Sequence, residues 1–217
     1  MTVAYVQPGL PADPWGETLD AILTDRKATA EFRIIRATRR LLTKDGLDIS
    51  VDAIAHEAGV GRRTVFRYFS SRDDLIAAAL DASLFIFQHE VRSTPKDDVP
   101  IDVWMFQVVS ALYSMQAGAG LGVWQLASTE DIRLPEPIAE INVRRREQRK
   151  EGTLSIAQSA WDRLGKSGDV PREVELMFAM SISSFNVRSL AFDYEANANE
   201  VIRMISNVLV SYLKSID

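Results

Sequence analysis

The chain has 217 residues, and its 47% hydrophobic and 25% charged residues are typical of a globular protein rather than a disordered, collagen-like or membrane chain. The absence of cysteine and the presence of only two histidines exclude a disulfide scaffold, a cysteine nucleophile and a thiolate zinc site. The net charge of −5 at pH 7, taken over the whole chain, does not suggest a nucleic-acid-binding protein. We predict no cofactor and no metal site.

The first residues are dense in helix breakers, with three prolines and two glycines before residue 17. This composition predicts a flexible arm over residues 1–24. The arm has neither the basic region nor the apolar region of a secretory signal. No apolar run in the chain approaches the roughly 18 residues that cross a bilayer. We therefore expect a cytoplasmic protein with no membrane partner.

Two short helices are predicted after a longer one. Apolar residues recur at helical spacing over 25–45, and Gly46 follows as a helix end. Ser50 suits the N-cap of the segment VDAIAHEA, because its hydroxyl can accept a hydrogen bond from a backbone N–H of the first turn. Gly59 predicts the end of that helix, since glycine adopts the left-handed conformation most easily. The segment RRTVFRYF predicts the next short helix.

The rest of the chain also has helical patterning. Further helices are expected over about 72–92, over 101–117, in the segment VWQLAS after the glycine-rich interruption AGAGLG, in a long polar helix that starts near Pro135, over 171–194 and over 197–215. No segment shows a strong alternation with the period of two that strands have. The predicted fold is all-α, with about nine helices.

The two short helices have the layout of a helix-turn-helix. Their apolar positions would form one small core: Ile54, Ala55, Ala58, Val60, Val65 and Phe69. This core leaves a polar and aromatic set outward on the second helix: Arg62, Arg63, Thr64, Phe66, Arg67 and Tyr68. Arginine can form bidentate hydrogen bonds with guanine or phosphate, and hydroxyl groups can form hydrogen bonds with phosphate. An aromatic edge can contact a thymine methyl group. The pattern therefore indicates a recognition helix.

The charge is unevenly distributed along the chain. Residues 26–72 hold eleven basic and five acidic residues, a net charge of +6, which leaves −11 for the remainder. A basic lobe on an acidic body is the electrostatic footprint of a DNA-binding protein. The whole-chain charge therefore does not exclude nucleic acid.

Residues 34–76, from IIRATRRLLTKDG through SVDAIAHEAGVGRRTVFRYFSSRDDLI, resemble the DNA-binding domain of the tetracycline-repressor (TetR) family of bacterial transcription regulators. The specific features are the AGV turn, the Thr-x-aromatic-x-Tyr-Phe helix and the basic residue that precedes Leu75. The resemblance implies that Arg62, Arg63 and Phe66 face bases in the major groove. It implies that phosphates are held by Ser50, Thr64, Arg67, Tyr68 and Arg72.

Three positions depart from the pattern of the family. Gly61 stands where the family often has a serine that caps the recognition helix. Phe66 replaces a common tyrosine and so removes a hydroxyl contact while keeping the ring. Arg39 occupies a site that is usually apolar. These departures affect the detail of base contact rather than the assignment.

The resemblance also implies an organisation for the whole chain. It places a DNA-binding domain at 25–71 and an effector-binding and dimerisation domain at 72–217, with a homodimer formed through the last two helices. Large apolar residues in the body are candidates for the wall of an effector pocket, against the alternative of plain core packing. The candidates are Trp104, Tyr113, Met115, Trp124, Phe178 and Phe185. Few charges lie within 101–128, which favours an apolar or aromatic small-molecule effector.

The leading hypothesis is a ligand-responsive transcription regulator, a repressor that binds a palindromic double-stranded DNA operator as a dimer. A second hypothesis is an all-α small-molecule-binding or adaptor protein whose helix-turn-helix packs against a protein partner. A third is an enzyme on a helical scaffold, but no catalytic constellation is present in the sequence. We therefore do not predict an enzyme.

Overall fold

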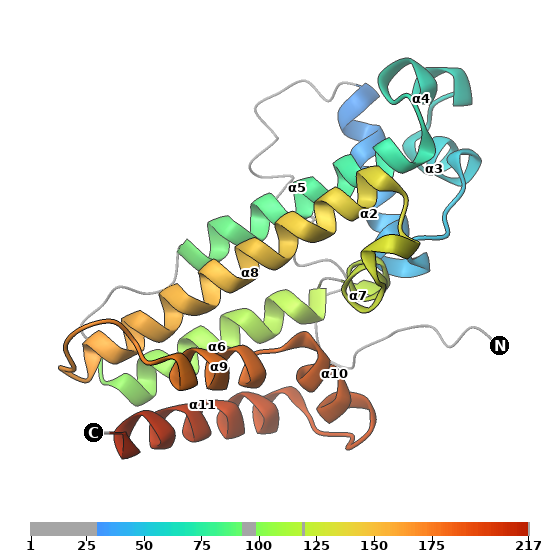
Figure 1. Ribbon diagram of the computed structural model, residues 1–217. Coiled ribbons are helices and arrows are strands. Elements are labelled where there is room, and N and C mark those ends of the chain that lie inside the picture. Colours follow the sequence, from blue (N-terminus) through green and yellow to red (C-terminus); the bar gives the residue numbers. More distant parts are fainter. Residues whose placement is uncertain (1–29, 93–98, 119, 217) are drawn as a thin grey trace. The chain divides into compact units, whose positions relative to one another are not determined.

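The computed structural model describes residues 30–92, 99–118 and 120–216, and within these ranges it is all helical (Figure 1). The helices are α2 (Ala30–Asp45), α3 (Val51–Ala58), α4 (Arg62–Tyr68), α5 (Arg72–Arg92), α6 (Ile101–Gly118), α7 (Gly120–Ser128), the 3-10 turn η1 (Asp131–Arg133), α8 (Glu136–Arg163), α9 (Arg172–Ser181), α10 (Ser184–Phe192) and α11 (Ala198–Ser215). The all-α prediction is confirmed, and the predicted arm over 1–24 lies outside the described residues. In the described ranges, no helix is both long and apolar enough to cross a bilayer.

The chain forms two compact units, one from residues up to 87 with 117–146 and the other from 88–116 with 147–217. The helices α5, α6 and α8 contribute residues to both units. The predicted domain boundary between residues 71 and 72 stays a prediction.

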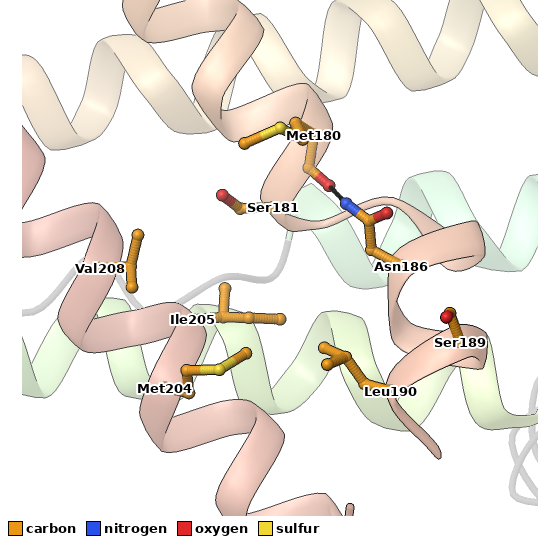
Figure 2. Close-up of a pocket in the computed structure, with 8 residues that line it drawn as sticks. All are labelled: Met180, Ser181, Asn186, Ser189, Leu190, Met204, Ile205 and Val208. Atoms are coloured by element: carbon orange, nitrogen blue, oxygen red, sulfur yellow. Dashed lines mark hydrogen bonds between the residues drawn. The ribbon is translucent and has the colours of Figure 1, made fainter. Parts of the chain in front are cut away.

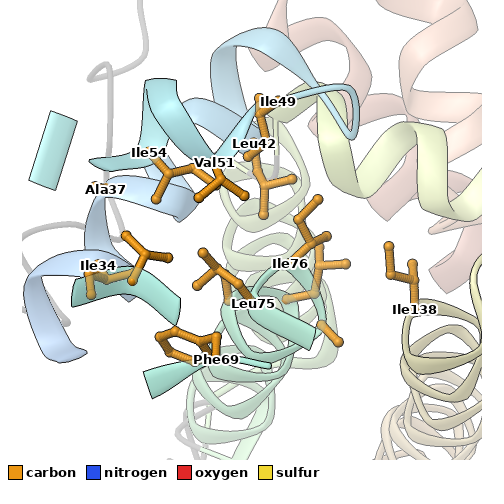
Figure 3. Packing of buried hydrophobic residues seen from close by; sticks show 14 of the residues in the cluster. Ile34, Ala37, Leu42, Ile49, Val51, Ile54, Phe69, Leu75, Ile76 and Ile138 are labelled. Atoms are coloured by element: carbon orange, nitrogen blue, oxygen red, sulfur yellow. The ribbon is translucent and has the colours of Figure 1, made fainter. Parts of the chain in front are cut away.

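The hydrophobic core of the first unit packs the short helices α3 and α4 against α2, α5, α7 and α8. Figure 3 shows Ile34 of α2, Ile54 of α3 and Leu75 of α5 gathered in one cluster, and all three are fully buried. Val65 of α4 and Phe69 join the same cluster, together with Leu126 of α7 and Ile138 of α8. Burial of this apolar surface contributes a free energy of roughly 25 cal/mol per Å². This contribution stabilises α3 and α4, which are too short to be stable helices on their own.

Backbone-to-backbone contact fixes α7 against α2. A Cβ atom on Gly120, which has φ +70°, would lie 2.5 Å from Cα of Thr43, and one on Gly122 would lie 2.9 Å from the carbonyl oxygen of Leu42. Beyond them, Oε1 of Gln125 accepts a hydrogen bond of 2.6 Å from the backbone N–H of Leu47. The sequence-based interpretation of AGAGLG as an interruption is wrong from Gly120 onward, because α7 begins there. The glycines are needed for the close approach of the two helices.

The second unit shows a break that the sequence analysis did not predict. The helix expected over 171–194 is two helices, because α9 ends at Ser181 and α10 begins at Ser184. The freed carbonyl groups receive donors from two other helices. Nε2 of Gln116 donates to the carbonyl of Ile182 at 2.6 Å, and Nη2 of Arg149 donates to the carbonyl of Ala179 at 3.1 Å. Burial lowers the pKa of Arg149 from its usual value.

The last helix is strongly amphipathic. A capping box starts α11: Asn197 accepts from the backbone N–H of Glu200, and the carboxylate of Glu200 accepts from the backbone N–H of Asn197. One face is buried and consists of Val201, Ile202, Ile205, Ser206, Leu209, Val210 and Leu213. The opposite face leaves Met204 and Val208 about half exposed.

Candidate nucleic-acid interface

The predicted caps of α3 are present. The Ser50 hydroxyl accepts a hydrogen bond of 3.1 Å from the backbone N–H of Ala53. Gly59 has φ +64° and ends the helix in the left-handed conformation. The backbone N–H of Val60 then donates to the carbonyl of Ala55 at 3.0 Å. These local bonds set the tight turn that leads from α3 to α4.

The buried and exposed positions of α4 are those that its sequence predicts. Val65 is buried, and Phe69 is buried directly after the helix. The outward set of Arg62, Arg63, Phe66, Arg67 and Tyr68 is exposed, and Thr64 is partly exposed. We call this outward set, with Thr64, the α4 face. It presents cationic, hydroxyl and aromatic groups to solvent, the side-chain types that bind DNA bases and phosphates.

Arg62 is held at two points. Its Nη1 atom lies 2.7 Å from Oδ2 of Asp52, which is in the first turn of α3. Its guanidinium also lies over the ring of Phe66, one turn further along α4, at 5.3 Å from the ring centroid. Sequence analysis did not identify Asp52, because no spacing rule links two residues on separate helices.

The other two arginines of the α4 face differ in their surroundings. The guanidinium of Arg67 lies over the ring of Tyr68, at 5.0 Å from its centroid. Arg63 is exposed, and no residue in the described ranges forms an ion pair or hydrogen bond with it. Stacked arginines have fewer side-chain conformations to lose when they bind a partner.

The resemblance implies that Arg72 binds a phosphate, but in the structure its guanidinium forms hydrogen bonds within the protein. Its Nε donates to the carbonyl of Ile49 at 2.6 Å, and its Nη2 donates to the carbonyl of Leu47. Its Nη1 lies 3.0 Å from Oδ1 of Asp73. Arg72 therefore ties the start of α5 to the loop that precedes α3, and a phosphate contact by Arg72 stays a prediction. Ser50 is exposed, and its hydroxyl keeps a hydrogen to donate after it has accepted from Ala53.

The six residues predicted for the effector pocket are not brought together as one set. The buried ones are Trp104, Tyr113, Met115 and Phe178, which lie in the second unit. Trp124 is partly exposed on α7 in the first unit, and Phe185 is exposed on α10. Their role as pocket residues stays a prediction.

A groove of about 290 Å³ lies instead between α9, α10 and α11 (Figure 2). It is lined by Met180, Ser181, Asn186, Ser189, Leu190, Met204, Ile205 and Val208, and none of the six predicted residues lines it. We call it the C-terminal groove. At one edge Nδ2 of Asn186 donates to the carbonyl of Met180, the bond drawn in Figure 2. The unpredicted break between α9 and α10 brings these residues together, so helical spacing alone did not reveal the groove.

Comparisons with known proteins agree with the geometry. Residues 34–79 match the family described as bacterial regulatory proteins, tetR family. A putative transcriptional regulator from Pseudomonas aeruginosa PAO1 has a similar fold, with TM-score 0.63 and 16% identity over 85% of this chain and 90% of that one. A TetR-like transcriptional regulator from Rhodococcus sp. RHA1 gives TM-score 0.62 and 12% identity over 88% and 99%.

The transcriptional regulator FadR from Bacillus subtilis, in complex with stearoyl-CoA, gives TM-score 0.61 and 17% identity over 84% of this chain and 97% of that one. No curated protein matches this chain in sequence. The structural neighbours extend the likeness from the short matched segment to the fold of most of the chain.

Proposed function

We propose that this chain, whose residues 34–79 belong to the tetR family of bacterial regulatory proteins, is a homodimeric transcription repressor of the cytoplasm that a small apolar effector releases from DNA. The observation that carries the proposal is the α4 face. Val65 and Phe69 anchor the helix in the core, so three arginines and two aromatic rings are turned outward on a single helix of seven residues.

The electrostatics of the segment favour DNA as the partner. Its net charge of +6 over 26–72 attracts the phosphate backbone. The exposed guanidinium groups of Arg62 and Arg63 can then reach guanine edges in the major groove, while Arg67 and Tyr68 can hold phosphates. Because one short recognition helix reads only a few base pairs, a two-fold pair that reads a palindrome is needed for specificity.

The surface around the C-terminal groove supports the homodimer. Three of the side chains that line it are large, apolar and about half exposed: Met180, Met204 and Val208. Single exposed apolar residues are ordinary, but a group of them at one groove is typical of an interface. A second copy of the chain, packed by its own last helices, would remove this surface from water.

The effector is proposed from chemistry and likeness together. Stearoyl-CoA, the molecule bound to the similar FadR structure, has a long apolar chain. The segment 101–128 of the present chain holds few charged residues, which favours an apolar rather than a highly charged effector. The effector must bind the DNA-free state better than the DNA-bound state, because otherwise the equilibrium does not shift. Thermal-shift screening should therefore show stabilisation by compounds that carry a long acyl chain, and a response restricted to highly charged compounds without an apolar chain would reject an apolar effector.

The central experiment is a gel shift with the DNA upstream of the protein's own gene at defined salt. Replacing Arg62 and Arg63 by alanine together should weaken binding by roughly 2–6 kcal/mol, since each two-pronged base contact contributes about 1–3 kcal/mol. Affinity should also fall steeply with salt, because phosphate contacts release counterions. Arg133→Ala with Lys150→Ala removes two exposed cations outside α4 and serves as the control. Unchanged binding by the Arg62 and Arg63 variant would reject α4 as the recognition helix.

A further inference from the structure

We propose that Asp52 is a positioning residue that prepares Arg62 to read a guanine. The proposal rests on the proposed function and concerns how the α4 face achieves specificity. The carboxylate of Asp52 lies on α3 and the guanidinium of Arg62 at the start of α4, with Oδ2 and Nη1 2.7 Å apart. The pair thus crosses from the supporting helix to the recognition helix.

The geometry leaves the reading edge of Arg62 open. The contact with Asp52 uses Nη1, and the described residues place no partner on Nε or Nη2. These two nitrogens lie on one edge of the planar guanidinium and form the fork that pairs with O6 and N7 of guanine. Asp52 contacts the remaining nitrogen and so leaves this edge available to a base.

The ring of Phe66 adds the second restraint. The guanidinium lies 5.3 Å from the ring centroid, so Asp52 and Phe66 hold it from different directions. The fork of an arginine that is fixed at two points loses little rotamer freedom when it meets a base. The departure from tyrosine at position 66 keeps the ring that this restraint requires.

The ion pair contributes little to folding. The side chains of Arg62 and Asp52 are 56% and 70% exposed, and exposed pairs of this kind are worth little in measured stability. Its effect is therefore expected in DNA recognition, where the orientation of one guanidinium decides which base pair is accepted. Asp52 also places a negative charge near DNA, so its removal should strengthen general attraction to phosphates.

The test uses the full chain and two duplexes: one selected by the wild-type protein from a randomised pool, and one of the same composition in scrambled order. The Asp52→Ala variant should lower the ratio of the two affinities by about two- to tenfold, the cost of ordering a flexible side chain on binding. Its affinity for the scrambled duplex should stay equal or rise. Repeating the selection should show relaxed preference at the base pair that Arg62→Ala also relaxes, which a merely structural role would not produce.

Glu57→Ala is the matched control, because it removes the same charge from the same helix. Its carboxylate pairs at 3.1 Å with Arg40 of α2, away from α4, so the ratio should not change. Asp52→Asn keeps an acceptor oxygen and should fall between Asp52→Ala and the wild type. Asp52→Ala should also have no effect on the ratio when Arg62 is already alanine.

The outcomes separate the two proposals. A wild-type protein that does not prefer any selected duplex overturns the proposed function. A wild-type preference that Arg62→Ala weakens but Asp52→Ala leaves unchanged overturns the positioning role alone. A higher ratio for Asp52→Ala would show that Asp52 restrains Arg62 from DNA and would overturn it as well.

Discussion

The α4 face and the C-terminal groove are both exposed surfaces on well-packed helices, but their side chains are of opposite kinds. On α4 the outward groups are three arginines, two of them stacked on aromatic rings, whereas Met180, Met204 and Val208 of the groove are apolar. Behind each surface the helices bury a regular apolar face, so exposure alone does not distinguish them. The exposed side chains therefore indicate the kind of partner that each surface binds. The partner is a polyanion for α4 and another apolar surface for the groove.

The largest expected effect on folding stability concerns the unit that carries the α4 face. Gly120→Ala should lower the free energy of unfolding by about 2–5 kcal/mol, which combines the left-handed backbone penalty with overpacking. At φ +70° the new Cβ would lie 2.5 Å from Cα of Thr43, a backbone atom that cannot move alone. Chemical denaturation measures the loss, and operator binding should weaken with it.

Gly59→Ala is the control for this prediction. Gly59 has a similar φ of +64°, but its added Cβ would meet no atom within 4 Å. Only the backbone penalty of about 1–2 kcal/mol should then remain. Equal losses for the two variants would show that the structure accommodates a methyl group at position 120, so that close packing of α7 on α2 does not require glycine there.

The second prediction concerns the C-terminal groove as the dimer interface. Met204→Glu should raise the dissociation constant of the dimer about 100-fold or more, because an unpaired carboxylate in an apolar interface costs roughly 3 kcal/mol. Met204 is 46% exposed, so the folded subunit should tolerate the change. Analytical ultracentrifugation measures the association. Ile132→Glu introduces the same charge at a position in η1 that is 91% exposed, and it should leave association unchanged.

The third prediction tests which basic residues of the DNA-binding segment are available to bind DNA. Arg72→Ala should lower the free energy of unfolding by about 2 kcal/mol, since hydrogen bonds from a charged group are worth roughly 1.5–3 kcal/mol. The lost bonds are those to the carbonyls of Leu47 and Ile49. Arg67→Ala should barely change stability and should weaken DNA binding instead. If Arg72→Ala lost only DNA affinity, its main contact would be a phosphate.

The parts predicted well from sequence depend on local chemistry. Ser50 and Gly59 bound α3 because a hydroxyl cap and a left-handed glycine act within a few residues of the chain. The buried Val65 and Phe69 and the outward arginines follow from the period of a helix.

The parts that were missed depend on contacts between distant segments. The break between α9 and α10 has neither proline nor glycine to mark it, and side-chain donors from Gln116 and Arg149 satisfy the carbonyls near it. The glycines at 120 and 122 were assigned to an interruption between helices, but α7 begins at Gly120 and both glycines approach the backbone of α2 closely. Likewise, the pair of Asp52 and Arg62 joins two helices whose relative placement no sequence period specifies. A local signal for the break is Ser183, whose side chain caps the start of α10.

The smallest expected effect concerns the start of α4, where Gly61 offers no side chain to cap the helix. Gly61→Ser should raise the free energy of unfolding by about 0.3 kcal/mol, because a serine hydroxyl can accept from a backbone N–H of the first turn. The backbone of Gly61 is extended and a Cβ there meets nothing within 4 Å, so the serine fits. The same substitution at Gly59, where φ is +64°, should instead lose about 1 kcal/mol. Denaturation of the two variants under identical conditions gives opposite signs if the cap is what α4 lacks, and a loss in both would show that glycine at 61 is required for another reason.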